Sequence, residues 1–218
     1  MFAPDQALAA LALEHPECEE ALRALGLDYA CAGASSLEAA CAARGVPLAQ
    51  AQAALAAAAA LGPDPMVLDA RDLPTPDLLV ELQARHHAYA RSALRVVVDL
   101  SAKVAEVHGH RHLIELASGV TLLSRLVTAQ LEREEAHLFP LLQSGESAPG
   151  LAQLLAASRK DHEQVVQLLG RLRPVAEYYS PPADACRSQR SLYAELAALD
   201  QDLVRHAHLE LNVLHPRC

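Results

Sequence analysis

Two stretches of this 218-residue sequence repeat one frame of residues that can bind metal. The first frame holds Gln130, Glu134, Leu138 and Pro140, and the second holds His206, Glu210, Leu214 and Pro216 at the same spacing. On a helix, residues four positions apart lie on one face about 6 Å from each other, so His206 and Glu210 can point at one interior spot. Glu134 can meet them there from an antiparallel neighbouring helix. The repeat therefore predicts a buried metal site of imidazoles and carboxylates.

Histidine is abundant, and two more histidines fall in the middle of predicted helices. The chain has 11 His, while aromatic residues make up 3% of it and Trp is absent. His87 and His162 each lie within a long predicted helix. Facing carboxylates completed by imidazoles are the di-iron arrangement of helical bundles. In a second interpretation these are surface histidines of amphipathic helices; the repeated frame favours metal binding.

The elements that must position these residues are helices. Ala and Leu occur throughout, and alternation with a period of two residues is nearly absent. Apolar periodicity predicts four long helices over residues 77–107, 112–142, 149–173 and 184–214, joined by short connections. The fold class is therefore all-α, an up-down four-helix bundle over residues 77–218.

A separate segment precedes the predicted bundle. Residues 1–61 predict a small N-terminal helical domain, with shorter helices that end at Gly26, Gly33 and Gly45. Residues 62–76 are rich in proline and predict a linker.

Composition excludes several classes of protein. The net charge of −9 repels phosphate backbones, so no nucleic-acid partner is expected. Charged residues or proline interrupt every long apolar run, so no membrane partner is expected. The N-terminus does not have the pattern of a signal peptide, and the five cysteines form no C-x-x-C pair, so we expect a cytoplasmic protein with reduced thiols. No nucleophile set or nucleotide motif appears, which leaves enzymatic activity open but disfavoured.

Longer motifs add a family resemblance. The H-x-x-x-E frame and LFP resemble the hemerythrin-like domain, and LGLDYACAG, VHG and SPPADAC resemble the iron–sulfur cluster repair di-iron family of the RIC, or YtfE/ScdA, type. The resemblance covers essentially the whole chain. It implies a cytoplasmic di-iron protein of nitric oxide and oxidative stress, with four His and two bridging Glu as ligands. By motif, the ligands carried over are His87, Glu134, His162, His206 and Glu210.

The sequence departs from that family at a ligand position. Gln130 stands where the family has its second-helix His, and an amide oxygen is a weaker iron ligand than imidazole. The iron site served by this position is predicted to be loose, open or empty. His137 lies further along the same face and is a candidate substitute ligand. His86 is predicted to face away from the site, because adjacent helix residues differ by about 100°. His208 is rotated by about 200° from His206 and is predicted to face solvent.

The second departure concerns a cysteine pair. The family pattern has two adjacent cysteines before two glycines, whereas this chain has only Cys31, between Ala30 and Ala32. A vicinal dithiol can clamp a metal, but a single thiol cannot do so alone. Cys31 stays a candidate for redox or iron transfer, with a buried packing cysteine as the alternative.

Three functional hypotheses follow. The first is a non-haem di-iron protein that binds nitric oxide or supplies iron for the repair of damaged iron–sulfur clusters, with iron–sulfur proteins as clients. The second is a hemerythrin-like protein that binds or senses O2. The third is a helical interaction protein whose metal site has decayed. A homodimer is compatible with all three.

Overall fold

The protein is helical, as the sequence predicts. The computed structural model describes residues 2–62, 69–144 and 149–218. Within these ranges the one β-type pairing is an isolated antiparallel bridge between Ala7 and Ser36. The all-α fold class is therefore confirmed. Of the predicted linker, residues 63–68 lie outside the described ranges.

The chain divides into two compact units, and the last helix belongs to both. One unit contains residues 1–74 and 207–218, and the other contains residues 75–206.

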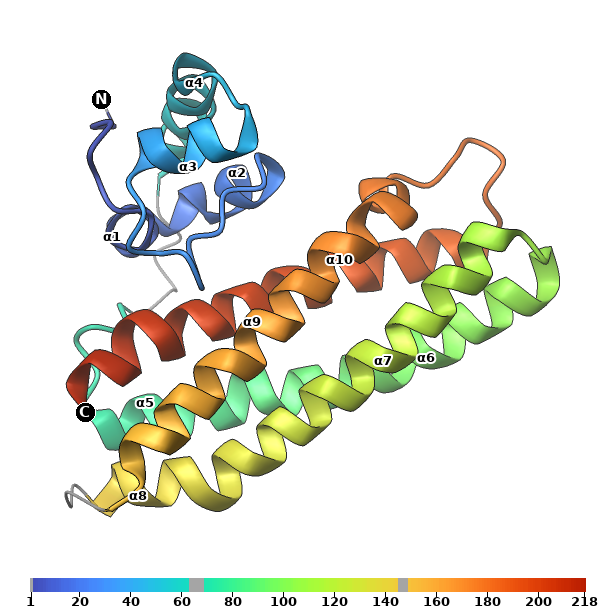
Figure 1. Cartoon of the computed structure of the whole chain (residues 1–218). Coiled ribbons are helices and arrows are strands. Elements are labelled where there is room, and N and C mark those ends of the chain that lie inside the picture. The colour runs from blue at the N-terminus through green and yellow to red at the C-terminus, as the bar shows by residue number, and fades with distance from the viewer. Residues whose placement is uncertain (1, 63–68, 145–148) are drawn as a thin grey trace. The chain divides into compact units, whose positions relative to one another are not determined.

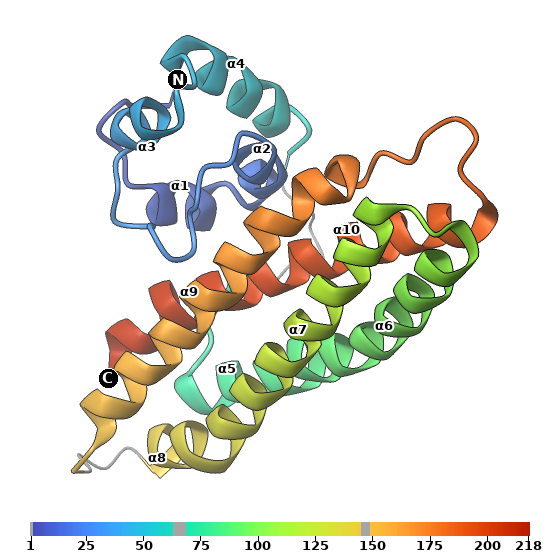
Figure 2. The ribbon, with the colours of Figure 1, turned by 45° about the vertical axis from the view of Figure 1, so that its right-hand side comes forward.

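The unit of residues 75–206 is built from long antiparallel helical segments. Figures 1 and 2 show α6 and α7 as a hairpin, and α9 and α10 as a second antiparallel pair. The elements are α5 (Thr75–Glu81), the turn η2 (Leu82–His87), α6 (Ala88–His108), α7 (Arg111–Arg133), the turn η3 (Glu134–Leu138), α8 (Phe139–Ser144), α9 (Leu151–Val175) and α10 (Arg187–Leu209). Their apolar faces, with Leu and Val at helical spacing, form the core of this unit.

Three of the long helical segments contain a π-helical turn. The turns are η2, η3 and η5 (Glu210–Leu214), and each continues an α-helix without a break in helical dihedral angles. A π turn accommodates one extra residue, and such turns are frequent at functional sites. His87, Glu134 and Glu210 all lie in these turns.

A buried ion pair joins α9 to α10. Both nitrogens of the Arg173 guanidinium fork donate to the Asp200 carboxylate at 2.7 Å, and the Tyr179 hydroxyl donates to it at 2.7 Å. Asp200 is fully buried, so these donors compensate for its lost hydration.

The other unit packs short helices around a leucine core, in which Leu8, Leu11, Leu22, Leu37 and Leu55 are fully buried. Its elements are α1 (Leu8–Glu14), η1 (Pro16–Cys18), α2 (Glu19–Ala24), α3 (Leu37–Arg44), α4 (Leu48–Ala59), η5 and η6 (His215–Arg217). The Ser36 hydroxyl caps α3 by accepting a hydrogen bond from the Ala39 amide at 3.2 Å.

Hydrogen bonds tie the C-terminal residues of this unit to its N-terminal residues. Asn212 Nδ2 donates to the Ala30 carbonyl at 2.9 Å, and the Arg217 guanidinium donates to the Leu73 and Ala70 carbonyls at 2.6 and 2.9 Å. Gly33 lies in the same region, where a Cβ atom would meet the Tyr29 carbonyl oxygen at 2.7 Å and Asn212 Oδ1 at 2.8 Å. Only glycine fits this close approach of chain segments.

Across the described residues, no helix combines the length and apolar character that crossing a membrane requires.

Candidate metal centre

Imidazole and carboxylate groups from three helical segments converge in the unit of residues 75–206. His87 Nε2 lies 3.1 Å from His206 Nε2 and 3.7 Å from Glu134 Oε2. All three side chains are at most 2% exposed. The sequence prediction that His87, Glu134 and His206 share one interior spot therefore agrees with the structure.

Glu210 completes this group from the same helix as His206. It lies four residues later, at the start of η5, and is fully buried. One ligand atom from each of His87, Glu134, His206 and Glu210 lies within 4.8 Å of the others. We call these four residues the primary ligand group.

His162 and Gln130 contact the other carboxylate oxygen of Glu134, and the His162 ring lies 5.2 Å from the His206 ring. His162 Nε2 is 3.3 Å from Glu134 Oε1, and the Gln130 amide nitrogen donates to the same oxygen at 3.1 Å. The Gln130 amide also contacts His162 Nδ1 at 2.9 Å, and the Ser158 hydroxyl donates to Glu134 Oε1 at 3.3 Å. Gln130 is thus buried and points into the site, as the repeated frame predicts for that position.

A second carboxylate orients His87. Glu135 Oε1 accepts a hydrogen bond from His87 Nδ1 at 2.8 Å. The Arg91 guanidinium donates to Glu135 Oε1 at 2.8 Å and to Glu135 Oε2 at 2.9 Å. The hydrogen bonds from Arg91 hold the pKa of Glu135 below its usual range, and His87 acts in the same direction. The ionised carboxylate fixes the proton on Nδ1, so the lone pair that can bind a cation is on Nε2. Glu135 and Arg91 were not identified from the sequence, because neither belongs to the repeated frame.

His86 is buried although it lies outside the primary ligand group. Its Nδ1 is 2.7 Å from Asp202 Oδ1, and its ring stacks on His206 with centroids 5.9 Å apart. His86 is outside the primary ligand group, but it does not face away from the site as expected, because its ring contacts His206.

The structure does not bring two other candidates into the group. His137 is exposed, so its side chain is not placed as a substitute for the missing histidine. Cys31 lies in the loop after Asp28, in the unit of residues 1–74 and 207–218, and is partly buried. Asp28 Oδ1 accepts hydrogen bonds there from the Cys31 amide at 2.8 Å and the Ala30 amide at 3.1 Å.

The expectation that His208 faces solvent is wrong. His208 is only 1% exposed, its ring meets Tyr29 edge-on at 5.1 Å, and its Nδ1 lies 3.1 Å from the Asn212 amide. Helical periodicity places His208 away from His206, but it does not reveal that Tyr29 covers that face.

The donor set of this site fits a cation such as iron. Two imidazole nitrogens and two carboxylates converge in a volume closed to solvent, where their desolvation is unfavourable unless a cation or other partners compensate. Mixed nitrogen and oxygen donors with a carboxylate-oriented histidine suit non-haem iron. The chemistry of the residues therefore indicates a metal centre.

Comparison with known proteins agrees with this geometry. The Hemerythrin HHE cation binding domain family matches residues 78–218. Over 215 residues, 98% of this chain and 96% of each relative, the chain is 30% identical to the iron-sulfur cluster repair protein YtfE of Musicola paradisiaca, 28% to that of Escherichia coli O157:H7 and 27% to that of Citrobacter koseri. Together with the buried His and Glu ligands, these matches show that the chain belongs to the hemerythrin HHE cation-binding family and, within it, to the relatives of YtfE.

Proposed function

We propose that this protein is a cytoplasmic non-haem iron protein that binds nitric oxide or supplies iron for the repair of damaged iron–sulfur clusters. The names of its relatives support the repair role. Iron–sulfur proteins are the proposed clients.

The observation that carries the proposal is the asymmetry of the site about Glu134. On one side, two histidines and two glutamates offer ligand atoms that all lie within 4.8 Å of one another. On the other side, His162 is accompanied by Gln130, whose amide nitrogen donates to Glu134 Oε1 at 3.1 Å. An amide in place of imidazole weakens iron binding at this second position. A di-iron site with one firm and one weak position is suited to giving up iron.

The residues around Glu134 support iron release. Gln130 and Ser158 both donate to Glu134 Oε1, the oxygen that faces His162. These hydrogen bonds compete with a second iron for the same lone pairs and stabilise the carboxylate when that iron is absent. A bound ferrous ion would supply the affinity for nitric oxide, while the protein residues hold its position and exclude solvent.

The asymmetry favours repair over reversible O2 binding, because O2 binding in hemerythrin-like proteins needs two retained irons. The hypothesis of a decayed site is disfavoured by the complete primary ligand group.

Iron content and release in anaerobically purified protein test the proposal. We expect the wild type to lose one iron to a chelator in a fast phase and to retain the other. Gln130→His should convert the fast phase to a slow one. Glu134→Ala should lose both irons, because Glu134 contacts both sides of the site.

The matched control is Gln153→Ala, an exposed glutamine nine residues before His162 in α9. Full iron retention in Glu134→Ala would exclude the assigned site. Absence of iron from both the wild type and Gln130→His would favour an interaction protein. If iron transfer is the function, apo aconitase mixed with the iron-loaded Gln130→His variant should regain activity more slowly than apo aconitase mixed with the iron-loaded wild type.

A further inference from the structure

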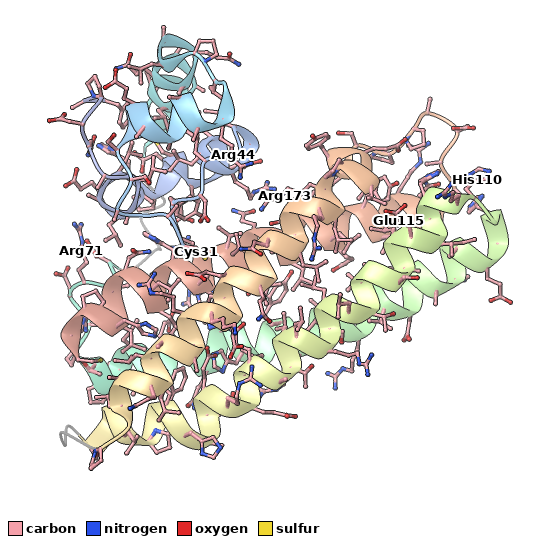
Figure 3. The ribbon with its side chains drawn as sticks, in the orientation of Figure 1. Cys31, Arg44, Arg71, His110, Glu115 and Arg173 are labelled. Carbon is pink, nitrogen blue, oxygen red and sulfur yellow. The ribbon has the colours of Figure 1, made fainter. Side chains whose placement is uncertain are left out.

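Three histidines and one cysteine gather at the end of the bundle opposite the primary ligand group. They are His108, His110, His112 and Cys186, all in the unit of residues 75–206. This is the end where α6 passes into α7 and where the chain enters α10 (Figures 1 and 2). Figure 3 shows His110 at this end, near Glu115 of α7. None of these residues has a role in the proposed iron centre.

A tight reversal of the chain brings the histidines together. His108 ends α6, Gly109 adopts a left-handed conformation with φ 64°, and α7 begins at Arg111. The ring centroids of His108 and His110 are 6.0 Å apart, and those of His110 and His112 are 5.7 Å apart. Three imidazoles thus follow one another along this turn in an H-x-H-x-H pattern.

Cys186 approaches the same histidines from a distant part of the sequence. Its Sγ lies 3.2 Å from His108 Nε2 and accepts a hydrogen bond from the Gln189 amide at 3.4 Å, just before α10 begins. This amide hydrogen bond places the sulfur at the start of α10. The thiolate is the form of cysteine that binds metals.

One pair of these groups, His108 and Cys186, has the spacing of two ligands of one zinc ion. With Zn–N near 2.0 Å and Zn–S near 2.3 Å, a tetrahedral ion sets a nitrogen and a sulfur ligand about 3.5 Å apart and two ring centroids about 5 Å apart. The observed His108–Cys186 contact of 3.2 Å is close to the value of about 3.5 Å, and the centroid separations of 6.0 and 5.7 Å exceed the value of about 5 Å by about 1 Å or less. His110 and His112 are exposed, so their rings can rotate to close the difference.

We propose that His108, His110, His112 and Cys186 bind one Zn²⁺ ion. Thiolate and imidazole ligands together select zinc over the harder cations. Binding replaces the thiol proton of Cys186, which is released to solvent. The ion would hold the α6–α7 turn against the start of α10.

Metal titration of the iron-loaded protein tests this site, with iron measured alongside because a chelator can empty the weaker iron position. Competition with a chromophoric chelator should show one Zn²⁺ per chain that the wild type binds and Cys186→Ser does not. With Co²⁺ as probe, a thiolate-to-cobalt charge-transfer band in the near ultraviolet should identify Cys186 as a ligand. Cys186→Ser should abolish the band, and His110→Asn should weaken Zn²⁺ binding by about 100-fold or more.

The variants keep the test independent of folding and of the iron centre. Serine is a favourable N-cap, so Cys186→Ser preserves the start of α10. Cys218→Ser, at the exposed C-terminal cysteine, is the matched control and should leave both Zn²⁺ affinity and the Co²⁺ band unchanged. The proposal is overturned if Cys186→Ser binds Zn²⁺ as the wild type does, or if Zn²⁺ enters only by displacing iron.

Discussion

Glu135 lies outside the primary ligand group, but it orients the ring of one of its members, His87. It accepts a hydrogen bond from His87 Nδ1 and is itself fixed by two hydrogen bonds from Arg91. Such carboxylate–histidine contacts fix the ring orientation and raise the basicity of the nitrogen that binds metal.

Removing the charge of Glu135 should therefore weaken iron binding without removing a ligand. We expect Glu135→Gln to lower iron affinity by about 10- to 100-fold, which chelator competition measures. Glu132→Gln, an exposed neighbour, is the control. Unchanged affinity in Glu135→Gln would show that the orientation of His87 depends on packing alone.

The thiols should differ in reactivity with pH. Burial raises the pKa of Cys18 from 9.0 to about 11, and the nearby Glu17 charge acts in the same direction. Because the thiolate is the reactive form, two pH units correspond to about a hundredfold lower thiolate fraction near neutral pH. Iodoacetamide at pH 7.5, followed by peptide mass spectrometry, should label exposed Cys218 well before Cys18. Raising the pH should increase the labelling of Cys18 up to pH 11. Rapid modification of Cys18 in the folded protein at neutral pH would contradict a buried Cys18 thiol with a raised pKa.

At the scale of elements, the π turns place the ligands. Glu134 begins η3 and Glu210 begins η5, at equivalent positions of the repeated frame. An extra residue in each turn changes the direction of the side chains that follow it by about 100°. The ligand positions therefore depend on turn geometry as well as on the residue types.

Deleting Ala136 should convert η3 to an ordinary α-helical turn. The helix residues before and after the deletion would then be rotated relative to each other. The variant could therefore not keep both the Glu134 carboxylate in the site and the Phe139 ring in the core. We expect loss of iron with little change in helical circular dichroism. Ala136→Ser, which keeps the chain length, should bind iron as the wild type does. Normal iron binding by the deletion variant would show that η3 does not position Glu134.

The long helices could be predicted from the sequence, and the π turns could not. Apolar periodicity gives the first long helix as residues 77–107, and the structure has helical residues from Thr75 to His108. One extra residue in a helix leaves no mark in composition or in apolar spacing over a single turn. The primary ligand group was predictable because the frame at Glu134 and Glu210 repeats. Glu135 was not, because its role depends on a contact with a residue 48 positions away.

At the scale of the whole molecule, the last helix joins the two compact units. Residues up to His206 belong with the bundle, and residues from Ala207 belong with the N-terminal segment. Periodicity could not predict this division, which explains the wrong expectation for His208. Within the unit of residues 1–74 and 207–218, Asn212 is one of the polar links, because it donates to the Ala30 carbonyl and contacts His208.

Replacing Asn212 should destabilise the protein. We expect Asn212→Ala to lower the free energy of unfolding by about 1–3 kcal/mol, because the partly buried backbone carbonyl of Ala30 loses a donor. Urea denaturation measures this change, and Gln153→Ala, which is exposed, should stay within about 0.5 kcal/mol of the wild type. A change below that margin in Asn212→Ala would mean that water replaces the lost hydrogen bond.

The three π turns also have a thermodynamic consequence. Hydrogen bonds in a π turn close a wider ring than those of an α-helix, so the backbone opens most easily where the ligands lie. We therefore expect part of the free energy of cation binding to go into ordering η2, η3 and η5, so that the net affinity is lower than the same ligands on rigid helices would give. Amide hydrogens in these turns should exchange faster in the iron-free protein than those of neighbouring α-helical turns. Exchange at the same rate as in those α-helical turns would show that the π turns do not lower the affinity of the site.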